Sequence, residues 1–262
     1  MSRVLDDELT EAAHFLRDRD IEEAWAEAHI LLAGALGIDR ARLPAVDDVP
    51  DVARERFREF VRRRGETREP VAYILGRCEF YGLTFRTTPA ALIPRPASET
   101  LVERALALRP GTALDVGTGS GAIAVVLAKH GVRVTATEMS DAALDLAREN
   151  AASHGATIEF RKADLFVDGD FDLIVSNPPY VKSAEVDDQA PDLRHEPRLA
   201  FDGGPDGLRE IRRLLAPARG PILIEVGAGQ PPAVTDLALR AGFRDVRWWK
   251  DLLGIDRVLE AR

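Results

Sequence analysis

Hydrophobic residues recur at helical spacing through the first 75 residues of the chain. The repeats cover residues 9–16, 24–36 and 57–61, where apolar side chains return every three or four positions. Gly37 follows the second repeat and is typical of a residue that ends a helix. The pattern therefore predicts a small helical domain over residues 1–75.

The pattern changes between residues 76 and 96. Aromatic and β-branched residues flank Gly82, and a proline-rich stretch follows. Such a run around a glycine is typical of two short strands joined by a turn. We expect a β-hairpin that links the helical domain to the rest of the chain.

From residue 97 onward, runs typical of strands alternate with runs typical of helices. The strands are nearly continuous apolar runs, as in a parallel sheet that is covered on both faces. The last two strands follow each other without a helix, which suggests an antiparallel pair. We expect strands at 112–116, 132–137, 158–163, 171–176, 221–226, 244–250 and 256–261, and helices at 97–109, 120–130, 141–153, 206–216 and 230–241. Residues 97–262 thus form an α/β domain.

Composition narrows the classes of protein to which the chain can belong. Of its 262 residues, 45% are hydrophobic and 30% are charged, as in an ordinary soluble globular protein. Cys78 is the single cysteine, so an internal disulfide is excluded and a reducing cytosol fits. The N-terminus has no apolar signal-peptide core, and no apolar run is long enough to span a membrane. We expect a cytoplasmic protein without membrane contact.

The net charge argues against binding to nucleic acid. The formal charge is −9 and the pI is about 5.2, whereas duplex nucleic acid is bound largely through Lys and Arg. Residues 53–69 are an exception, with seven Arg against four Glu. They fit either a solvated helix face with ion pairs between neighbouring turns, or a docking surface for an acidic or RNA-associated partner.

A glycine-rich loop lies at the first strand-to-helix turn of the α/β domain, within "LDVGTGSGAIA" at 114–124. Glycines allow a tight turn and close approach of a ligand, and the following helix offers free N–H groups. This context predicts a site for a nucleotide-like ligand. We expect the ligand to contact Gly117, Thr118, Gly119, Ser120 and Gly121.

Carboxylates near this loop narrow the choice of ligand. Glu138 closes the second strand, where a carboxylate can accept the ribose hydroxyls of NAD or of S-adenosylmethionine, so it does not discriminate between them. Asp115 precedes the glycines in the spacing D-x-G-x-G-x-G, which resembles Rossmann-like methyltransferases, as does the final antiparallel pair. That resemblance implies S-adenosylmethionine as cofactor, with Asp115 and Glu138 among the residues that bind it, Asp164 near the adenine amino group and Leu165 against the ring. We expect no metal, because no His or Cys cluster has metal-ligand spacing.

The stretch "IVSNPPY" at 174–180 ends the fourth predicted strand at the edge of the sheet where ligands bind in open α/β folds. The Asn177 side-chain oxygen and the Pro178 carbonyl can accept the two N–H groups of a conjugated NH₂, whose nitrogen is otherwise nearly non-nucleophilic. Pro178 and Pro179 bring no competing N–H, and proline fixes φ. Tyr180 can pack against a planar amide or ring. The motif fits methyl transfer to an adenine amino group or to a glutamine amide, and does not choose between them.

Several further segments, in order, resemble the release factor glutamine methyltransferases of the HemK/PrmC type. They are "EAHILLAGALGIDR" (27–40), "EPVAYILGRCEFYGLTF" (69–85), "LIPRPASETLVERAL" (92–106), "DVGTGSGAIA", "SNPPY", "HEPRLAFDGGPDGL" (195–208), "LIEVGAGQ" (223–230) and "DLLGIDRVL" (251–259). The resemblance covers nearly the whole chain. It implies an α/β fold: a Rossmann-like seven-stranded methyltransferase domain, with a small N-terminal helical domain joined by a β-hairpin.

The resemblance also implies an activity. It is methyl transfer from S-adenosylmethionine to the glutamine amide of the Gly-Gly-Gln motif in class 1 peptide chain release factors, which act in translation termination. Residues 1–75 would recognise the release factor, residues 97–262 would carry out catalysis, and residues 76–96 would link these two domains. We expect a monomer that binds no nucleic acid directly. The expected catalytic residues are Asn177, Pro178 and Tyr180, with Pro179 also against the substrate and Asn177 also near the cofactor.

The chain departs from the family pattern at a few positions. Ala97 and Ser98 stand where the family usually has an acidic residue and Thr, and Glu138 stands where Asp is usual. These changes leave the active-site motif intact, but keep a second hypothesis open. In it, the enzyme methylates an amide or guanidine nitrogen of a free amino acid or other small molecule.

Overall fold

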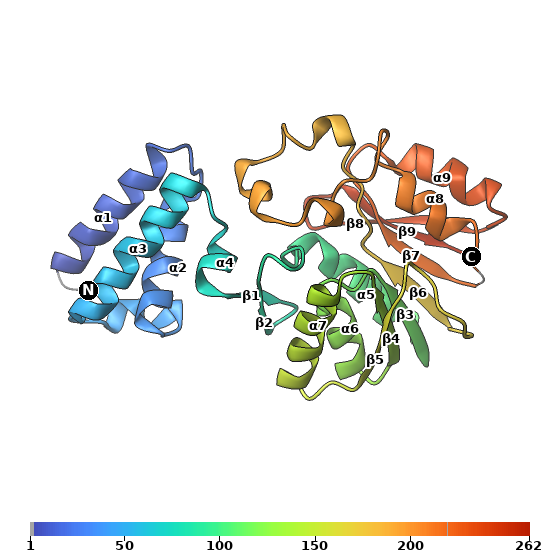
Figure 1. Cartoon of the computed structure of the whole chain (residues 1–262), viewed down its shortest axis with the longest axis horizontal. Helices are drawn as coiled ribbons and strands as arrows, with labels where there is room; N and C mark the ends of the chain where they lie inside the picture. The colour runs from blue at the N-terminus through green and yellow to red at the C-terminus, as the bar shows by residue number, and fades with distance from the viewer. Residues whose placement is uncertain (1–2, 219) are drawn as a thin grey trace. The chain divides into compact units, whose positions relative to one another are not determined.

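The chain folds into two compact units. The computed structural model describes residues 3–218 and 220–262 (Figure 1). The first unit comprises the described part of Met1–Gly76 together with Pro191–His195. The second comprises Arg77–Ala190 and the described part of Glu196–Arg262. Within the described residues, no helix is both long enough and apolar enough to cross a membrane.

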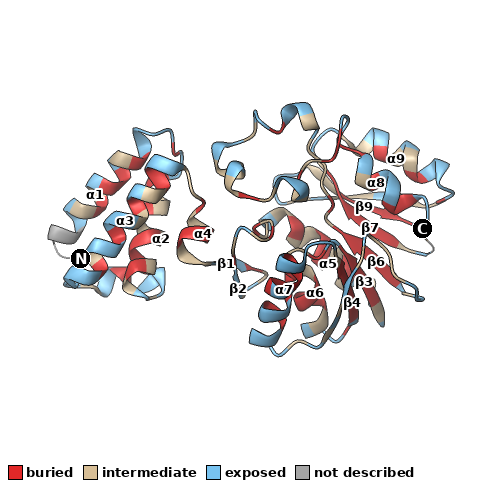
Figure 2. Ribbon diagram, viewed as in Figure 1, coloured by how far each residue is buried: buried red, intermediate tan, exposed pale blue. Residues whose placement is uncertain are grey.

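The first unit is a bundle of α-helices around an apolar core. Leu31 and Leu32 are fully buried, and Phe57 and Val61 pack into the same cluster. Figure 2 shows the buried positions along each helix in red. The helices of this unit are α1 (Arg3–Arg17), α2 (Ala24–Leu36), α3 (Asp51–Thr67) and α4 (Val71–Leu75), with a 3-10 segment at Arg40–Ala45. The helical domain expected from the sequence is confirmed.

The arginine-rich stretch lies on α3, and its charges are largely neutralised within the unit. Arg62 forms ion pairs with Glu59 at 2.9 Å and with Glu66 at 2.9 Å, three and four residues away. Arg63 pairs with Glu69. These contacts favour the interpretation of a helix face with ion pairs between turns, and the alternative of a docking surface stays a prediction.

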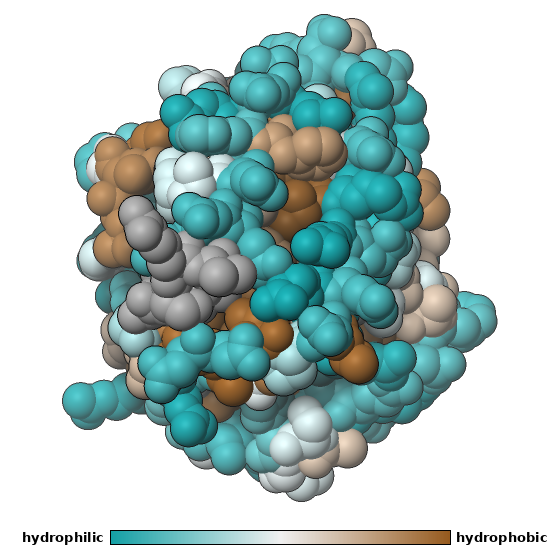
Figure 3. Space-filling view, turned by 90° about the vertical axis from the view of Figure 1, so that its left-hand side faces the viewer, coloured by the Kyte–Doolittle hydropathy of each residue, from teal (hydrophilic) through white to brown (hydrophobic). Residues whose placement is uncertain are grey.

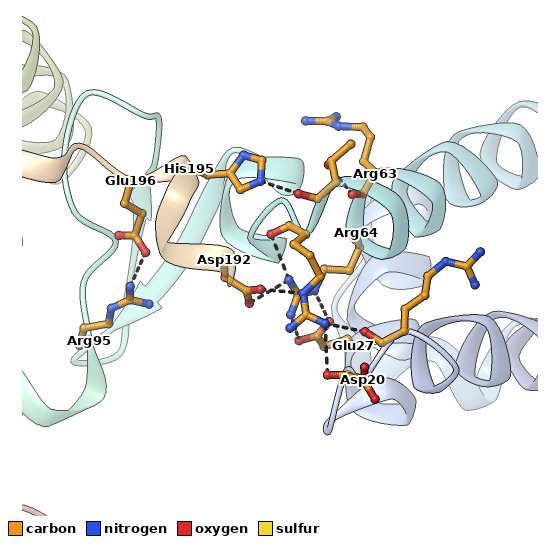
Figure 4. Close-up of polar contacts among 11 residues, drawn as sticks. Asp20, Glu27, Arg63, Arg64, Arg95, Asp192, His195 and Glu196 are labelled. Atoms are coloured by element: carbon orange, nitrogen blue, oxygen red, sulfur yellow. Dashed lines mark hydrogen bonds and ion pairs between the residues drawn. The ribbon is translucent and has the colours of Figure 1, made fainter. Parts of the chain in front are cut away.

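Five residues from far along the chain complete the helical unit. The buried Arg64 donates to Glu27 at 2.6 and 2.9 Å and forms an ion pair with Asp192 at 2.8 Å. Arg68 pairs with the same Asp192 carboxylate, and His195 Nε2 donates to the carbonyl of Thr67 at 2.7 Å (Figure 4). The segment Pro191–His195 thus belongs to this unit by its contacts, although it follows the "NPPY" stretch in sequence. The functional division 1–75, 76–96 and 97–262 stays a prediction.

The second unit is built on a seven-stranded sheet of order β5-β4-β3-β6-β7-β9-β8. Neighbouring strands are parallel from β5 to β7, whereas β9 is antiparallel to both β7 and β8. The expected α/β fold with a final antiparallel pair is confirmed. The strands are β3 (Thr112–Val116), β4 (Arg133–Glu138), β5 (Ile158–Lys162), β6 (Leu173–Ser176), β7 (Ile222–Glu225), β8 (Val246–Lys250) and β9 (Asp256–Ala261), and a separate hairpin is formed by β1 (Arg77–Phe80) and β2 (Leu83–Arg86).

Helices cover both faces of this sheet. Alternate residues of β6 point into different cores: Leu173 and Val175 into one, and Ile174 into the other. Helices α5, α6 and α7 pack on the first face, and α8 and α9 on the second (Figure 1). These helices are α5 (Glu99–Ala107), α6 (Ala122–Lys129), α7 (Asp141–Ser153), α8 (Arg209–Leu215) and α9 (Pro231–Arg240).

The strand order brings two loops together at the carboxyl edge of the sheet. Strand β3 lies between β4 and β6, so Val116 pairs with Thr137 on one side and with Ser176 on the other. The Ser176 hydroxyl also donates to the Val116 carbonyl at 2.8 Å. The chain order reverses between β3 and β6, and such a switch point is where open α/β sheets bind ligands. The glycine loop and the "NPPY" stretch are therefore neighbours.

A buried asparagine on α7 fastens the glycine loop to the hairpin. Asn150 Nδ2 donates to the carbonyls of Ser120 at 2.9 Å and Arg86 at 3.1 Å, and its Oδ1 accepts from the Arg86 N–H at 2.8 Å. These bonds join elements that are distant in sequence. The residue drew no attention in the sequence, because its partners are backbone groups.

We expect Asn150→Leu to lower the free energy of unfolding by roughly 2–4 kcal/mol, because three backbone groups lose their partner, and the one of Ser120 is buried. Urea denaturation measures the loss. The matched control is Arg148→Ala on the same helix, where an exposed pair with Asp145 is removed. It should cost less than about 0.5 kcal/mol. Equal losses in the two variants would contradict the role assigned to Asn150.

Candidate active site

A cavity of about 700 Å³ lies at the carboxyl edge of the sheet in the second unit. Its walls come from the linker before α5, the loops that follow β3 to β6, and the segment before α8. Ten of the residues expected from the sequence line it: Gly117, Thr118, Gly119, Ser120, Glu138, Asp164, Leu165, Asn177, Pro178 and Pro179. The structure thus brings together residues from four separate loops.

The three glycines of the loop after β3 have different surroundings. The backbone φ angles of Gly117, Gly119 and Gly121 are all positive, which favours glycine. A Cβ on Gly117 would meet no protein atom within 4 Å, so this position is open toward the cavity. A Cβ on Gly121 would lie 3.1 Å from the Cβ of Ala147 on α7. Gly121 therefore serves the close packing of α6 against α7 and is not among the residues that line the cavity.

Asp115 lies beneath the loop rather than on the cavity wall. Its Oδ2 accepts a hydrogen bond from the Thr118 hydroxyl at 2.6 Å, and its Oδ1 is buried without a partner among the described residues. Burial raises the pKa of Asp115 to about 7, against the opposing hydrogen bond from Thr118. The side chain of Asp115 thus hydrogen-bonds to Thr118 in the glycine loop. A direct contact of Asp115 with a cofactor stays a prediction.

Glu138 is held at the cavity by backbone N–H groups. Its Oε1 accepts from Met139 at 2.7 Å and from Ser140 at 3.0 Å, and its Oε2 accepts from Gly119 at 3.1 Å. A carboxylate has about four acceptor positions, so Oε2 keeps one of them for a ligand hydroxyl. The carboxylate is thus both oriented by the glycine loop and available to the cavity.

Asp164 and Leu165 line the cavity beyond β5. Asp164 forms an ion pair with Arg213 of α8 at 2.8 Å. Leu165 has a φ of 79°, which is unusual for a residue with a side chain, and its carbonyl accepts from the Thr137 hydroxyl at 2.6 Å. This bond to the end of β4 helps to hold Leu165 in the conformation that places it at the wall.

The "NPPY" residues divide between the cavity and the core. Asn177, Pro178 and Pro179 line the cavity, but Tyr180 is not among its lining residues and packs against the core beneath α8 and α9. The Tyr180 hydroxyl donates to Glu225 Oε1 at 3.4 Å. Burial raises the pKa of Tyr180 to about 12, so the hydroxyl stays a donor at neutral pH. The expected contact of Tyr180 with substrate stays a prediction.

The sequence did not predict that the linker forms a wall of the cavity. Ala91, Ile93 and Arg95 are among the lining residues, although we assigned the hairpin and linker no part in the site. The buried Glu196 fixes this wall, because its carboxylate accepts from the Ile93 N–H at 2.9 Å and pairs with Arg95 (Figure 4). The signal was present in the segments beginning "LIPRP" and "HEPR", but nothing in their local pattern shows that they meet.

Two further glycines support the "NPPY" stretch from behind. A Cβ on Gly203 would lie 2.7 Å from the Pro179 carbonyl oxygen, and one on Gly207 would lie 2.4 Å from the Tyr180 carbonyl oxygen. Gln230 adds a hydrogen bond from its Nε2 to that Tyr180 carbonyl at 2.9 Å. The backbone that carries Asn177 and Pro178 is therefore enclosed by residues from two later loops.

Comparisons with known proteins agree with this architecture. Residues 7–76 match the family model for the PrmC N-terminal domain, and residues 95–193 match the one for the methyltransferase small domain. A solved methyltransferase from Pyrococcus furiosus superposes with a TM-score of 0.54 at 23% identity, covering 70% of this chain and 89% of that one, which shows the fold alone.

Two curated relatives match almost from end to end. A release factor glutamine methyltransferase from Geobacter sulfurreducens is 43% identical over 265 residues, which cover 95% of this chain and 93% of the relative. One from Cereibacter sphaeroides is also 43% identical, and the match covers 98% of this chain and 97% of the relative. The resemblance stated from the sequence is confirmed. The chain belongs to the family of release factor glutamine methyltransferases.

Proposed function

We propose that this enzyme transfers a methyl group from S-adenosylmethionine to the side-chain amide nitrogen of the glutamine in the Gly-Gly-Gln motif of class 1 peptide chain release factors. The observation that carries the proposal is a juxtaposition. Asn177 and Pro178 line the same cavity as the glycine loop and Glu138. The two acceptors for a substrate amide therefore lie in the same cavity as the residues typical of a nucleotide-type site.

The residues present fit S-adenosylmethionine. The cavity of about 700 Å³ is of the size that small-molecule sites have. Gly117 leaves room for a ligand beside the backbone, and Glu138 Oε2 keeps an acceptor position for a ribose hydroxyl. We assign the adenine end to Asp164 and Leu165. When bound, the cofactor supplies a methyl group on a sulfonium centre.

The protein's part in the reaction is to orient the amide. The Asn177 side-chain oxygen and the Pro178 carbonyl accept the two N–H groups of the substrate amide, which turns its nitrogen toward the methyl group. Pro178 and Pro179 restrict the backbone, so these acceptors stay in place. Proximity and exclusion of water then supply most of the rate gain.

We assign recognition of the release factor to the helical domain. Its surface carries a groove of about 330 Å³ between α1 and α3, with Ala12, Phe15 and Val61 among its apolar residues. Figure 3 shows one face of the molecule, on which hydrophobic residues are exposed between hydrophilic ones. We further propose a cytoplasmic monomer that contacts no nucleic acid directly.

Mass spectrometry tests the proposed reaction. A full-length class 1 release factor is incubated with the enzyme and S-adenosylmethionine, and the peptide containing Gly-Gly-Gln is measured. We expect that peptide to gain the mass of one methyl group, and a release factor with Glu in place of this glutamine to gain none. Unchanged peptide mass, together with turnover of a free amino acid, would support the small-molecule hypothesis instead.

A further inference from the structure

Three side chains from separate parts of the second unit form a hydrogen-bonded chain beside the cavity. Ser98 ends the 3-10 turn before α5, Asn177 follows β6, and Glu225 is the last residue of β7. Ser98 and Asn177 line the cavity, whereas Glu225 has no exposed surface. The chain of contacts thus runs from the interior to the residue that we place against the substrate.

The direction of the Ser98 hydrogen bonds determines whether the oxygen or the NH₂ group of the Asn177 side chain contacts Ser98. Ser98 Oγ donates to Glu225 Oε2 at 2.5 Å, and Asn177 Nδ2 donates to Ser98 Oγ at 3.0 Å. A hydroxyl has one hydrogen, and an ionised carboxylate can only accept. While Glu225 Oε2 carries no proton, the Ser98 hydrogen is used on Glu225, and Ser98 offers only lone pairs to Asn177 and faces its NH₂ group. The Asn177 oxygen is the end that remains for the substrate.

The position of Glu225 is costly for a residue that serves stability alone. Its hydrogen-bond donors among the described residues are the hydroxyls of Ser98 and Tyr180, and no ion pair with it is found there. Burial raises the pKa of Glu225, and the hydrogen bond from Ser98 and the more distant charges of Arg257 and Arg95 oppose this shift. A buried carboxylate without a paired cation is unfavourable. A role for the Glu225 oxygens as acceptors of the Ser98 hydroxyl accounts for a buried carboxylate at this position.

We propose that Ser98 and Glu225 are positioning residues, which lock the Asn177 amide with its oxygen toward the substrate. The inference rests on the proposed role of Asn177 in methyl transfer. Without the lock, the amide can turn by half a rotation. Its NH₂ group would then face the NH₂ group of the substrate, and two donors cannot bond.

The first test compares variants of Ser98. We expect Ser98→Ala to lower kcat about tenfold, the effect of one lost hydrogen bond, while the Kd for S-adenosylmethionine stays the same. Ser98→Thr keeps the hydroxyl and should keep kcat. Glu225→Gln should also lower kcat, because an amide there can donate to Ser98 and turn the hydroxyl hydrogen toward Asn177. Wild-type kcat in Ser98→Ala would overturn the proposal for Ser98, and in Glu225→Gln the proposal for Glu225.

A double variant separates positioning from a general structural effect. In the Asn177→Ala background, Ser98→Ala should change kcat less than about twofold, because no amide is left to orient. An equal loss in both backgrounds would show that Ser98 acts in another way and would overturn the proposal.

Nuclear magnetic resonance tests the lock without relying on turnover. The side-chain NH₂ signals of Asn177, identified by their loss in Asn177→Ala, should shift in Ser98→Ala and Glu225→Gln and stay close to their wild-type positions in Ser98→Thr. Signals that do not move in any variant overturn the lock. If the wild-type enzyme leaves the release factor unmethylated, the proposed function fails, and these signals still decide whether the lock exists.

Discussion

Asn177→Ala is expected to lower kcat on the order of 10²–10³-fold, the range for loss of one preorganised hydrogen-bonding group in an active site. The variant removes the side-chain acceptor for the substrate amide but leaves the glycine loop and Glu138 in place. The Kd for S-adenosylmethionine should therefore change much less than kcat. Kinetics with a release factor measure the loss of kcat, and calorimetry measures the Kd for S-adenosylmethionine.

Pro178→Ala is the matched control for Asn177→Ala. It keeps the carbonyl that we assign to the second N–H of the substrate and loses only the restriction on φ. Its kcat should therefore fall less than that of Asn177→Ala. Near-normal turnover in Asn177→Ala would refute the acceptor role, whatever the result for Pro178→Ala.

The second large effect is expected for Gly207→Ala, a position that does not line the cavity. The added Cβ would lie 2.4 Å from the Tyr180 carbonyl oxygen and 2.7 Å from Gln230 Nε2. Because the first of these is a backbone atom, the loop that carries Gly207 and the "NPPY" stretch must move apart. A displacement of about 1 Å at reacting groups can cost on the order of 100-fold in rate, and we expect kcat to fall by that order.

Gly131→Ala controls for the strain that alanine suffers at a positive φ. Gly131 has a φ of 87°, and a Cβ there would meet no atom within 4 Å. The backbone penalty of about 1–2 kcal/mol should appear in thermal unfolding of both variants, with kcat reduced only in Gly207→Ala. A Gly207→Ala enzyme with the kcat of the control would show that the loop behind Tyr180 does not position the acceptors.

Elements with local signals were predicted well from the sequence. Helix α7 has the expected bounds, because the Ser140 side chain accepts from the Ala143 N–H at its start and Gly155, with a φ of 62°, follows its end. Strand β3 also has the expected bounds, since its apolar run stops at the glycine loop. Where the stop and start signals are in the sequence itself, the local pattern is sufficient.

Errors at element ends have local physical causes that the hydrophobic pattern does not show. The helix expected at 206–216 begins only at Arg209, because Gly207 has a φ of 74° and the Asp206 side chain accepts from the Leu208 N–H. The strand expected at 171–176 begins at Leu173, since Asp172 instead accepts from the N–H groups of Gly111 and Thr112. In each case a polar side chain replaces regular backbone bonding.

The candidate site was predicted where its residues lie in loops next to strands, and missed where they meet across the fold. Ten expected residues share the cavity because parallel strands end at one edge. The pair of Arg95 with Glu196 and the contact of Gly207 with Tyr180 depend on how distant loops return to that edge. The local spacing of residues in the sequence does not predict such contacts between distant loops.

The Asp192 contacts decide how domains can be exchanged between relatives. In a chimera that takes only residues 1–76 from another enzyme, the transplanted residue at position 64 would face a 191–195 segment from the recipient enzyme. Expressed alone, residues 1–76 would lack the carboxylate that Arg64 and Arg68 share. Removing one partner of a buried ion pair lowers the free energy of unfolding by roughly 3–5 kcal/mol. A transplant of substrate specificity therefore has to move two stretches of sequence together, and no single crossover point can do so.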